Sequence, residues 1–325
     1  MSPRFMAAQK DILLLGGFGA NGGSLSLYKV NSGTPGLLST AASGAAGVAL
    51  DASATSAYSS GGKSSNPNAT LSAFSITNGR FVALAGSPYS FTDSAGNPIN
   101  ADLLQVDPDG KFVYASFNPT VQHTPYGLFG VVVRNPDGSL AGFAPGSPQG
   151  GCTGGGGALA VAAEPGGNTF VYQSCSDGDW TFTFTIGARA VNQTTGVISA
   201  VPEFAESNYG GLAVGLAVDP TGKWLAATDV NNNMVHILAI NPATGALSES
   251  ANHVFPTGNR PNAVSFDRSG KYLYVTNGDY PWSAGSGSNN VSGFAFDPAT
   301  GALKPLLDSP YNTGKSPVSI VVMQP

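Results

Sequence analysis

Residues 261–277 read PNAVSFDRSGKYLYVTN, and this stretch holds the pattern that decides the fold. Two runs rich in Val, Tyr and Phe flank the turn Asp267-Arg268-Ser269-Gly270, as half-buried strands do. The Asp side chain can accept hydrogen bonds from the turn backbone, and Gly tolerates a left-handed φ. The stretch therefore predicts a β-hairpin.

The same pattern recurs along the chain with a period of roughly fifty residues. Its acidic turn residue stands at Asp51, Asp107, Glu164, Asp219 and Asp267. A second turn follows in four of the repeats, within residues 135–138, 194–196, 241–245 and 297–301. Two hairpins per repeat give four antiparallel strands, which is one blade of a β-propeller.

The two ends of the chain indicate how the propeller closes. Residues 313–322, TGKSPVSIVV, copy the start of a repeat at residues 257–266, TGNRPNAVSF, and residues 12–15 match a second strand. We therefore expect an all-β fold, a single closed β-propeller of four-stranded antiparallel blades, with the C-terminal strand completing the N-terminal blade. The repeat count is six, and seven remains open. Residues 1–10 are expected to be a tail and residues 11–325 the propeller domain.

Composition excludes several classes of protein. With 14 Lys plus Arg and a net charge of −5 among 325 residues, the chain has no basic surface for nucleic acid. No apolar run of about 18 residues is present, so we expect no membrane span. Cys152 and Cys175 flank one predicted hairpin; a disulfide and two separate thiols both remain open. The cysteines and three histidines form no zinc pattern, so we expect no metal and no cofactor.

The run Tyr274-Val275-Thr276-Asn277 after an Asp-x-x-Gly-Lys turn, with the Thr-Gly-x-x-Pro lead-ins, resembles the lactonase-type (YVTN-repeat) propeller family, which includes 6-phosphogluconolactonase-like proteins. The resemblance covers residues 11–325. It implies a site built from an Arg-His pair that enters an inner strand and a Glu after the signature strand. At the matching places this chain has Arg260 followed by Pro261, and Asp279 one position late.

Propeller ligands bind at the mouth of the central channel, where loops concentrate function. Arg260 and Lys315 occupy neighbouring lead-in segments and could bind an anion, although two solvated rim charges explain them as well. His123 lies in a loop of the same face, where its ordinary pKa near 6.5 suits proton transfer. The candidate catalytic residues are Arg260, His123 and Asp279. The candidate substrate-binding residues are Lys315, Asn262, Asn277, Tyr280, Trp282, Glu206, Tyr209, Asp229 and Asp177.

Two functions remain open from the sequence. The first is a lactonase-like hydrolase, monomeric, that acts on a small anionic lactone or sugar acid at the channel mouth. The second is a non-catalytic propeller, exported or at the surface, that binds a carbohydrate or a protein through its loops. The Gly-, Ser- and Asn-rich loops and the sparse Lys favour export to the periplasm or cell exterior.

Overall fold

The structure is a computed structural model that describes most of the chain. It describes residues 2–19, 22–31, 34–42, 47–61, 70–119, 126–153, 158–163, 168–175, 184–206, 211–249, 252–278, 287–314, 317 and 319–322, apart from the side chains of some residues beside the gaps. Two compact units are formed. The first contains residues 1–151, 192–198 and 325, and the second contains residues 152–191 and 199–324.

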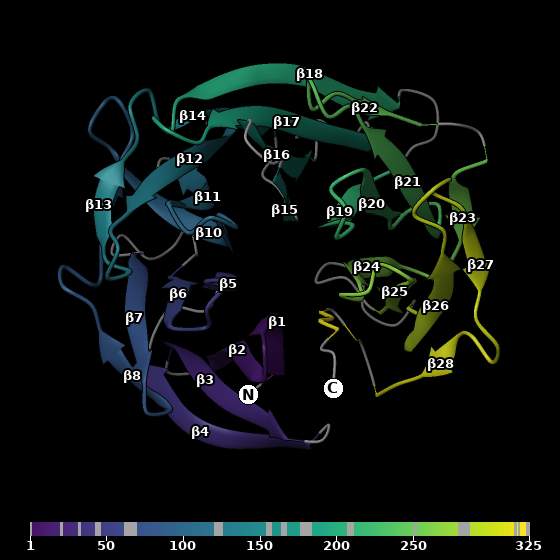
Figure 1. The fold of residues 1–325 in the computed structure, drawn as a ribbon, viewed down its shortest axis with the longest axis horizontal. Helices are drawn as coiled ribbons and strands as arrows, with labels where there is room; N and C mark the ends of the chain where they lie inside the picture. Colours follow the sequence, from purple (N-terminus) through teal and green to yellow (C-terminus); the bar gives the residue numbers. More distant parts are fainter. Residues whose placement is uncertain are drawn as a thin grey trace. The chain divides into compact units, whose positions relative to one another are not determined.

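The described residues form six antiparallel sheets, each with a four-stranded blade at its centre (Figure 1). Blade 1 is β1 (Ser2–Gln9), β2 (Ile12–Gly19), β3 (Gly22–Asn31) and β4 (Thr34–Ala42); blade 2 is β5 (Gly47–Leu50), β6 (Ser56–Ser60), β7 (Leu71–Thr77) and β8 (Arg80–Ala83). Blade 3 is β10 (Pro98–Val106), β11 (Phe112–Pro119), β12 (Tyr126–Arg134) and β13 (Leu140–Phe143), with β9 (Phe91–Thr92) and β14 (Gln149–Thr153) added.

The other three blades repeat this order. Blade 4 is β15 (Leu159–Ala163), β16 (Asn168–Cys175), β17 (Phe184–Asn192) and β18 (Ile198–Glu206). Blade 5 is β19 (Ala213–Val218), β20 (Trp224–Asp229), β21 (Met234–Ile240) and β22 (Leu247–Ser248), with β23 (Val254–Pro256) also paired to β21. Blade 6 is β24 (Pro261–Phe266), β25 (Tyr272–Asn277), β26 (Asn290–Phe296) and β27 (Leu303–Pro305), with β28 (Tyr311–Asn312) paired to β26. The predicted β-propeller class and the count of six blades are confirmed for the described residues.

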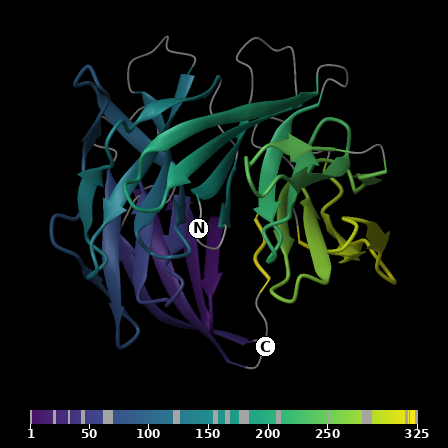
Figure 2. The same ribbon diagram turned by 45° about the horizontal axis from the view of Figure 1, so that its top comes forward.

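The first blade corrects the expectation about closure. Its inner strand is β1, which pairs with β2 from Gln9↔Ile12 to Ser2↔Phe18, so residues 2–9 are a strand and not a tail (Figure 2). Residues 319–322 belong to no strand, so the expected completion of blade 1 by a C-terminal strand was wrong. The two-residue link at Lys10 and Asp11 closes a hairpin at once, and local pairing costs far less loop-closure entropy than pairing with the distant end.

The predicted turns are confirmed in atomic detail at the first hairpin of the repeats. The Asp267 carboxylate accepts the N–H groups of Ser269 (3.1 Å), Lys271 (2.9 Å) and Tyr272 (2.8 Å). Burial tends to raise the pKa of Asp267, but the hydrogen bond from the Ser269 hydroxyl and those from these N–H groups outweigh it and hold the pKa below its usual value. Asp219 accepts the corresponding bonds in blade 5. The acidic residue of the repeat is therefore a turn cap.

We predict that Asp267→Ala lowers the free energy of unfolding by about 1–2 kcal/mol, because several turn N–H groups lose their acceptor. Asp267→Asn keeps one acceptor oxygen and should cost less. Urea unfolding of both variants checks this. The cap's contribution should also fade as the pH drops through the lowered pKa of Asp267, since protonation removes the charge that attracts the donors. Equal stability of Asp267→Ala and wild type would show that the turn needs no cap.

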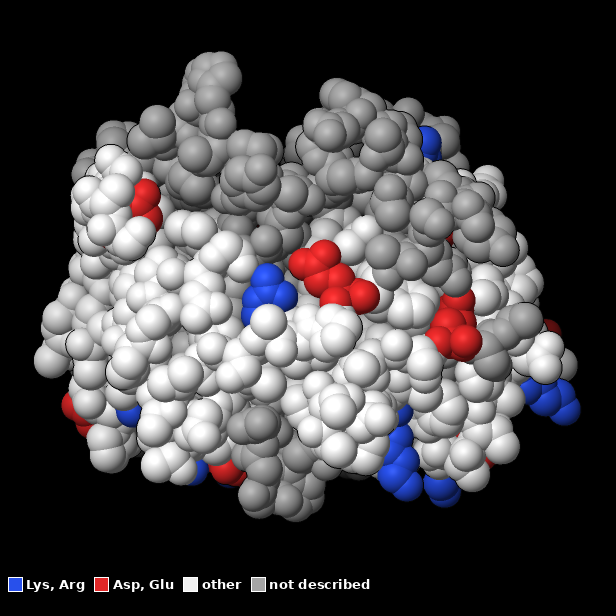
Figure 3. Space-filling model, turned by 90° about the horizontal axis from the view of Figure 1, so that it is seen from above, with Lys and Arg blue, Asp and Glu red and all other residues white. Residues whose placement is uncertain are grey.

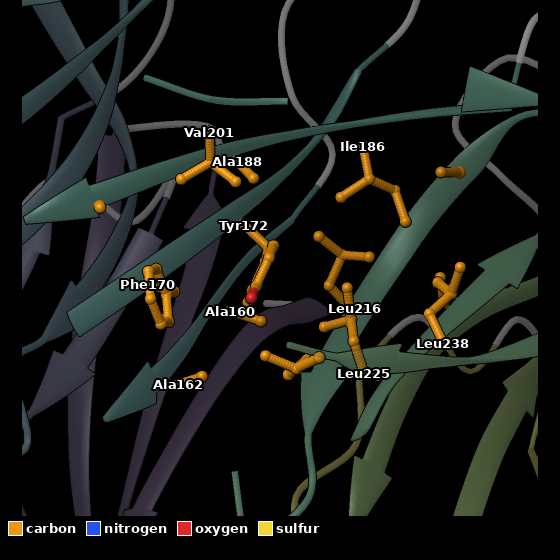
Figure 4. Packing of buried hydrophobic residues seen from close by; sticks show 14 residues of the cluster. Ala160, Ala162, Phe170, Tyr172, Ile186, Ala188, Val201, Leu216, Leu225 and Leu238 are labelled. Atoms are coloured by element: carbon orange, nitrogen blue, oxygen red, sulfur yellow. The ribbon is translucent and has the colours of Figure 1, made fainter. Parts of the chain in front are cut away.

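Hydrophobic cores lie between neighbouring blades. Phe170 and Tyr172 of β16 and Ile186 of β17 pack with Leu216 and Leu225 of blade 5 (Figure 4). All five side chains are buried, which gives the sheets their main cohesion. Corresponding clusters join blades 1 and 2, blades 2 and 3, and blades 5 and 6.

Tyrosine hydroxyls of one blade form hydrogen bonds with the second turn of the next blade. The Tyr58 hydroxyl donates to Gly138 O (2.8 Å), and the Tyr172 hydroxyl donates to Gly245 O (2.9 Å). The turn glycines themselves have positive φ and lie against the preceding blade; a Cβ at Gly245 would stand 2.3 Å from Phe170 Cδ1. The second turn of the repeat therefore serves two purposes, because it reverses the chain and docks on the neighbouring blade.

Inner strands of blades 3, 5 and 6 share a bulge near their start. In blade 5 the irregularity lies between Ala213 and Leu216, and the N–H of Gly215 is satisfied by the Thr228 hydroxyl (2.8 Å). The same hydroxyl donates to Asn262 O of blade 6 (3.0 Å). Bulges leave backbone groups outside the ladder, and these hydroxyls supply the missing partners.

Candidate functional site

The best-described candidate site lies where β24 begins and β25 ends, in blade 6. Pro261 at the start of β24 pairs with Asn277 at the end of β25, so both strand ends lie at the same edge. The N–H of Gly278 donates to Arg260 O (3.1 Å), which joins the segment before β24 to the residue after β25. Arg260, Asn262 and Asn277, all expected from the sequence as site residues, are therefore brought together.

Arg260 has an unusual backbone for a residue with a long side chain. Its φ is +60°, in the left-handed region that costs a non-glycine residue on the order of 1 kcal/mol. Its N–H donates to Asn233 Oδ1 (2.8 Å) of blade 5, which helps to hold this conformation. The guanidinium makes no hydrogen bond or ion pair with any residue that the structure describes, and the residue is half-buried.

Two buried amide side chains lie beside Arg260. Asn262 Nδ2 donates to Gly278 O (2.8 Å), and Asn277 Nδ2 donates to Asn290 Oδ1 (2.7 Å) and Ser292 Oγ (2.9 Å). The Oδ1 atoms of Asn262 and Asn277 are buried and find no hydrogen-bond donor among the described residues. A buried acceptor without a donor costs about 1–3 kcal/mol, so these two oxygens mark a place where a further donor is needed.

The lead-in segment 257–260 is held from both sides. Thr257 N donates to Asn233 O (3.0 Å) of blade 5, and Gly258 N donates to Ser292 Oγ (3.2 Å) of blade 6. A Cβ at Gly258 would lie 2.7 Å from both Asn277 Nδ2 and Asn290 Oδ1. Glycine is required here because the segment passes directly over the Asn277 amide.

A cluster of three ionisable side chains, Asp229, His236 and Glu249, lies in blade 5. Asp229, the last residue of β20, is buried and accepts the N–H groups of Leu212 (3.0 Å), Asn231 (3.0 Å) and Asn232 (3.2 Å). His236 Nε2 lies 3.8 Å from Asp229 Oδ2, which is ion-pair distance but too long for a hydrogen bond. On its other side, His236 Nδ1 is 2.8 Å from Glu249 Oε1.

The electrostatics of the cluster keep His236 charged. Burial alone would lower the pKa of His236, but the Asp229 and Glu249 carboxylates outweigh it and raise the pKa to about 9. Burial also tends to raise the pKa of Asp229, yet the imidazolium and the N–H donors hold that pKa below its usual value. The three side chains are thus two carboxylates around one imidazolium at neutral pH.

The remaining sequence-based candidates are placed only in part. Glu206 is the last residue of β18, and its side chain lies outside the described residues. Seven more candidates lie wholly outside them: His123, Asp279, Lys315, Tyr280, Trp282, Tyr209 and Asp177. No group of three or more His, Cys, Asp or Glu side chains in the described part is arranged to hold a metal ion. No helix in that part is long and apolar enough to cross a membrane.

Sequence reasoning missed Asn233 and Glu249. Asn233 has a φ of +59°, and it follows Asn231 and Asn232 directly before β21. Asn is enriched at left-handed turn positions, so the triple-Asn run was an available signal for a shaped loop. Glu249 carried no signal, because its pairing with His236 depends on the path of the chain after β22.

The described residues form a β-propeller in which Arg260, Asn262 and Asn277 lie together at one edge of blade 6. Residues 183–322, which include this site, match the family model described as "Lactonase, 7-bladed beta-propeller". The resemblance to the lactonase-type propellers is thereby confirmed. The described residues nevertheless form six blades, one fewer than the family's description.

Solved structures support the same fold. A protein from Lactobacillus plantarum has a TM-score of 0.71 and 17% identity, covering 97% of this chain and 86% of that one. A putative 6-phosphogluconolactonase from Bacteroides uniformis has a TM-score of 0.70 and 16% identity, covering 96% and 85%. A periplasmic gluconolactonase from Pseudomonas aeruginosa has a TM-score of 0.69 and 18% identity, covering 97% and 86%. No curated protein matches the chain.

Proposed function

We propose that this chain is a lactonase-like hydrolase that acts on a small anionic lactone or sugar acid at the Arg260 site. The observation that carries the proposal is Arg260 itself: its backbone is held in a left-handed conformation by Asn233, and its guanidinium has no partner among the described residues. Strained backbone of this kind concentrates at ligand sites, where the surrounding structure maintains it.

The chemistry assigned to the site follows from the residue types. The planar guanidinium of Arg260 binds a carboxylate or phosphate through two parallel hydrogen bonds. Lys315 is proposed as a second cation, and His123 and Asp279 are proposed to move protons during attack of water on the lactone carbonyl. Around them we propose contacts to substrate hydroxyls and ring from Asn262, Asn277, Tyr280, Trp282, Glu206, Tyr209 and Asp177. Asp229, also expected from the sequence to bind substrate, is buried with both oxygens bonded to its own loop, and we propose no substrate contact for it.

The comparisons support this proposal from two directions. The family model that matches residues 183–322 is a lactonase model, and it spans Arg260 and both strands that frame it. Two of the similar structures are named as a gluconolactonase and a putative 6-phosphogluconolactonase. We propose a monomer acting outside the cytoplasm; Cys175 is disulfide-bonded and Cys152 is the only other cysteine, which suits an oxidising compartment.

The test is hydrolysis of gluconolactone and a small lactone panel by the purified protein, followed by pH-stat. Arg260→Ala should lower kcat/KM by about 10–100-fold, because a charge-assisted pair contributes roughly 1.5–3 kcal/mol. Arg80→Ala, an exposed arginine of β8, is the matched control and should leave the rate unchanged. Turnover that persists in Arg260→Ala would remove this residue from the site.

A specific observation favours a second function, a non-catalytic propeller that binds carbohydrate or protein. The described side chains that bond to one another at the site are amides and a hydroxyl, from Asn277, Asn290 and Ser292, and the Asn262 amide donates to Gly278 O. Such groups recognise hydroxyls but do not titrate near neutral pH. Figure 3 shows one side of the molecule, on which Lys and Arg and Asp and Glu side chains lie scattered among uncharged residues. Absence of turnover above the spontaneous rate, with binding on a glycan array, would establish this function.

A further inference from the structure

Two hydrogen bonds attach the Arg260 segment to blade 5, and a single residue accepts both of them. Asn233 Oδ1 accepts the N–H of Arg260 (2.8 Å), and Asn233 O accepts the N–H of Thr257 (3.0 Å). Asn233 adopts a left-handed φ of +59°, which directs its side chain and its carbonyl to the same segment. The position of Arg260 therefore depends on the position of the loop that carries Asn233.

That loop is held by one carboxylate. Asp229 accepts the N–H groups of Asn231 (3.0 Å) and Asn232 (3.2 Å), and its second oxygen accepts from Asn232 Nδ2 (2.7 Å). Asp229 also accepts the N–H of Leu212 (3.0 Å), just before β19, so the loop is fixed to the inner strand of its own blade. The conformation of the loop therefore depends on the position of the Asp229 carboxylate.

Asp229 is buried beside a second carboxylate, and the imidazole between them balances the charge. The side chains of His236, Asp229 and Glu249 are 6%, 1% and 8% exposed. Asp229 and Glu249 are the charged side chains within ion-pair distance of His236 among the described residues; the β23 side of the cluster carries His253, whose ring packs on Trp224. Without the positive charge, two buried carboxylates would face each other across a neutral ring, and both would be destabilised.

We propose that His236 is a positioning residue for Arg260: its imidazolium holds Asp229, Asp229 holds the loop of residues 230–233, and Asn233 holds the Arg260 backbone in its left-handed conformation. The effect of His236 on anion binding rests on the proposed function. Its effect on the order of the Arg260 backbone does not depend on that function. His236 touches no substrate in this scheme. It acts through the two intervening residues.

Because His236 acts through its positive charge, the order of the Arg260 backbone should depend on pH, and the direction follows from the pKa of His236. The pKa of His236 is raised on folding from near 6.5 to about 9. Its contribution is therefore fully present below pH 6.5 and is lost as the pH rises through 9. The order of the Arg260 backbone, and with it the affinity of the site for an anion, should therefore fall over that alkaline range.

The direct test is amide hydrogen exchange at Arg260, measured across pH and corrected for intrinsic exchange. Arg260 N–H should be protected in the wild type at pH 7 and lose protection above pH 9. His236→Gln should show the unprotected state already at pH 7. Asn233→Gly, which retains the left-handed backbone but removes the Oδ1 acceptor, should also lose protection, and Asn233→Asp, which restores an acceptor, should regain it. Protection that is the same in wild type, His236→Gln and Asn233→Gly would overturn the inference.

A parallel measurement separates this inference from the proposed function. Gluconate affinity should fall about 10-fold in Asn233→Gly and His236→Gln at pH 7, and the wild type should approach the His236→Gln value above pH 9. If gluconate does not bind the wild type, or binds Arg260→Ala equally well, the proposed function fails and amide exchange alone decides the positioning role. The positioning role of His236 would be contradicted if gluconate affinity depends on Arg260 but is unaffected by Asn233→Gly and His236→Gln.

Discussion

Arg134→Ala is expected to lower the free energy of unfolding by about 3–5 kcal/mol, the largest stability effect of any single change considered for the first unit. Arg134, the last residue of β12, is nearly buried, and its guanidinium is shared between two blades. Nη2 donates to Asp51 Oδ2 (3.1 Å) and Ser56 Oγ (3.1 Å), and Nε donates to the Tyr58 hydroxyl (2.6 Å), all in blade 2. Nη1 donates to Gly110 O (2.9 Å) in blade 3.

The size of the effect follows from what alanine would leave behind. The Asp51 side chain is 7% exposed and would be left buried without its only ion-pair partner among the described residues. The Tyr58 hydroxyl would keep its bond to Gly138 O but lose the donor that it accepts from. Such networks cost more when one member is removed than the net value of the pair.

Chemical denaturation followed by far-UV circular dichroism measures this effect. Arg80→Ala serves as the matched control, since Arg80 is exposed in β8, and it should change the free energy of unfolding by less than about 0.5 kcal/mol. The double variant with Asp51→Asn should recover part of the loss, because the uncompensated charge is gone. If Arg134→Ala lowers the free energy of unfolding by less than about 1 kcal/mol, the ion pair between Arg134 and Asp51 is not needed to hold the two blades together.

Gly215→Ala is the second large effect, and it tests the contact between inner strands in the second unit. A Cβ at Gly215 would lie 2.1 Å from Asn262 O and 3.1 Å from Ala263 Cα. Both atoms are backbone of the next inner strand, so no side chain can rotate away. We expect a loss of roughly 2–3 kcal/mol from overpacking, with displacement of Asn262.

The same substitution has a consequence for the candidate site. Because Asn262 lies beside Arg260, Gly215→Ala should weaken ligand binding as well as stability. Tryptophan fluorescence during urea unfolding gives the stability change, since Trp224 lies in blade 5. Gly150→Ala is the matched control: a Cβ there meets nothing within 4 Å, and its stability should be that of the wild type. A fully stable Gly215→Ala variant would show that the two inner strands can separate at no cost.

Much of the fold could be predicted because each blade is built from local pairings. The turn at Asp267 and Gly270 forms between strands a few residues apart, and the positive φ of Gly270 is the one that the Asp-x-x-Gly pattern predicts. The site was predicted in part for the same reason. Arg260, Asn262 and Asn277 belong to one hairpin and its lead-in, so their proximity follows from the register of β24 and β25.

The sequence by itself determined the hairpin repeat, the six blades and the turn caps, since these depend on alternating apolar residues and on side chains that bond within five residues of themselves. Tertiary structure alone decided that Arg134 reaches Asp51 across 83 positions and that Asn233 holds Arg260 across 27. The physical reason is that these contacts join different hairpins. No periodicity or turn signal encodes which side chains meet when two separately folded sheets pack together.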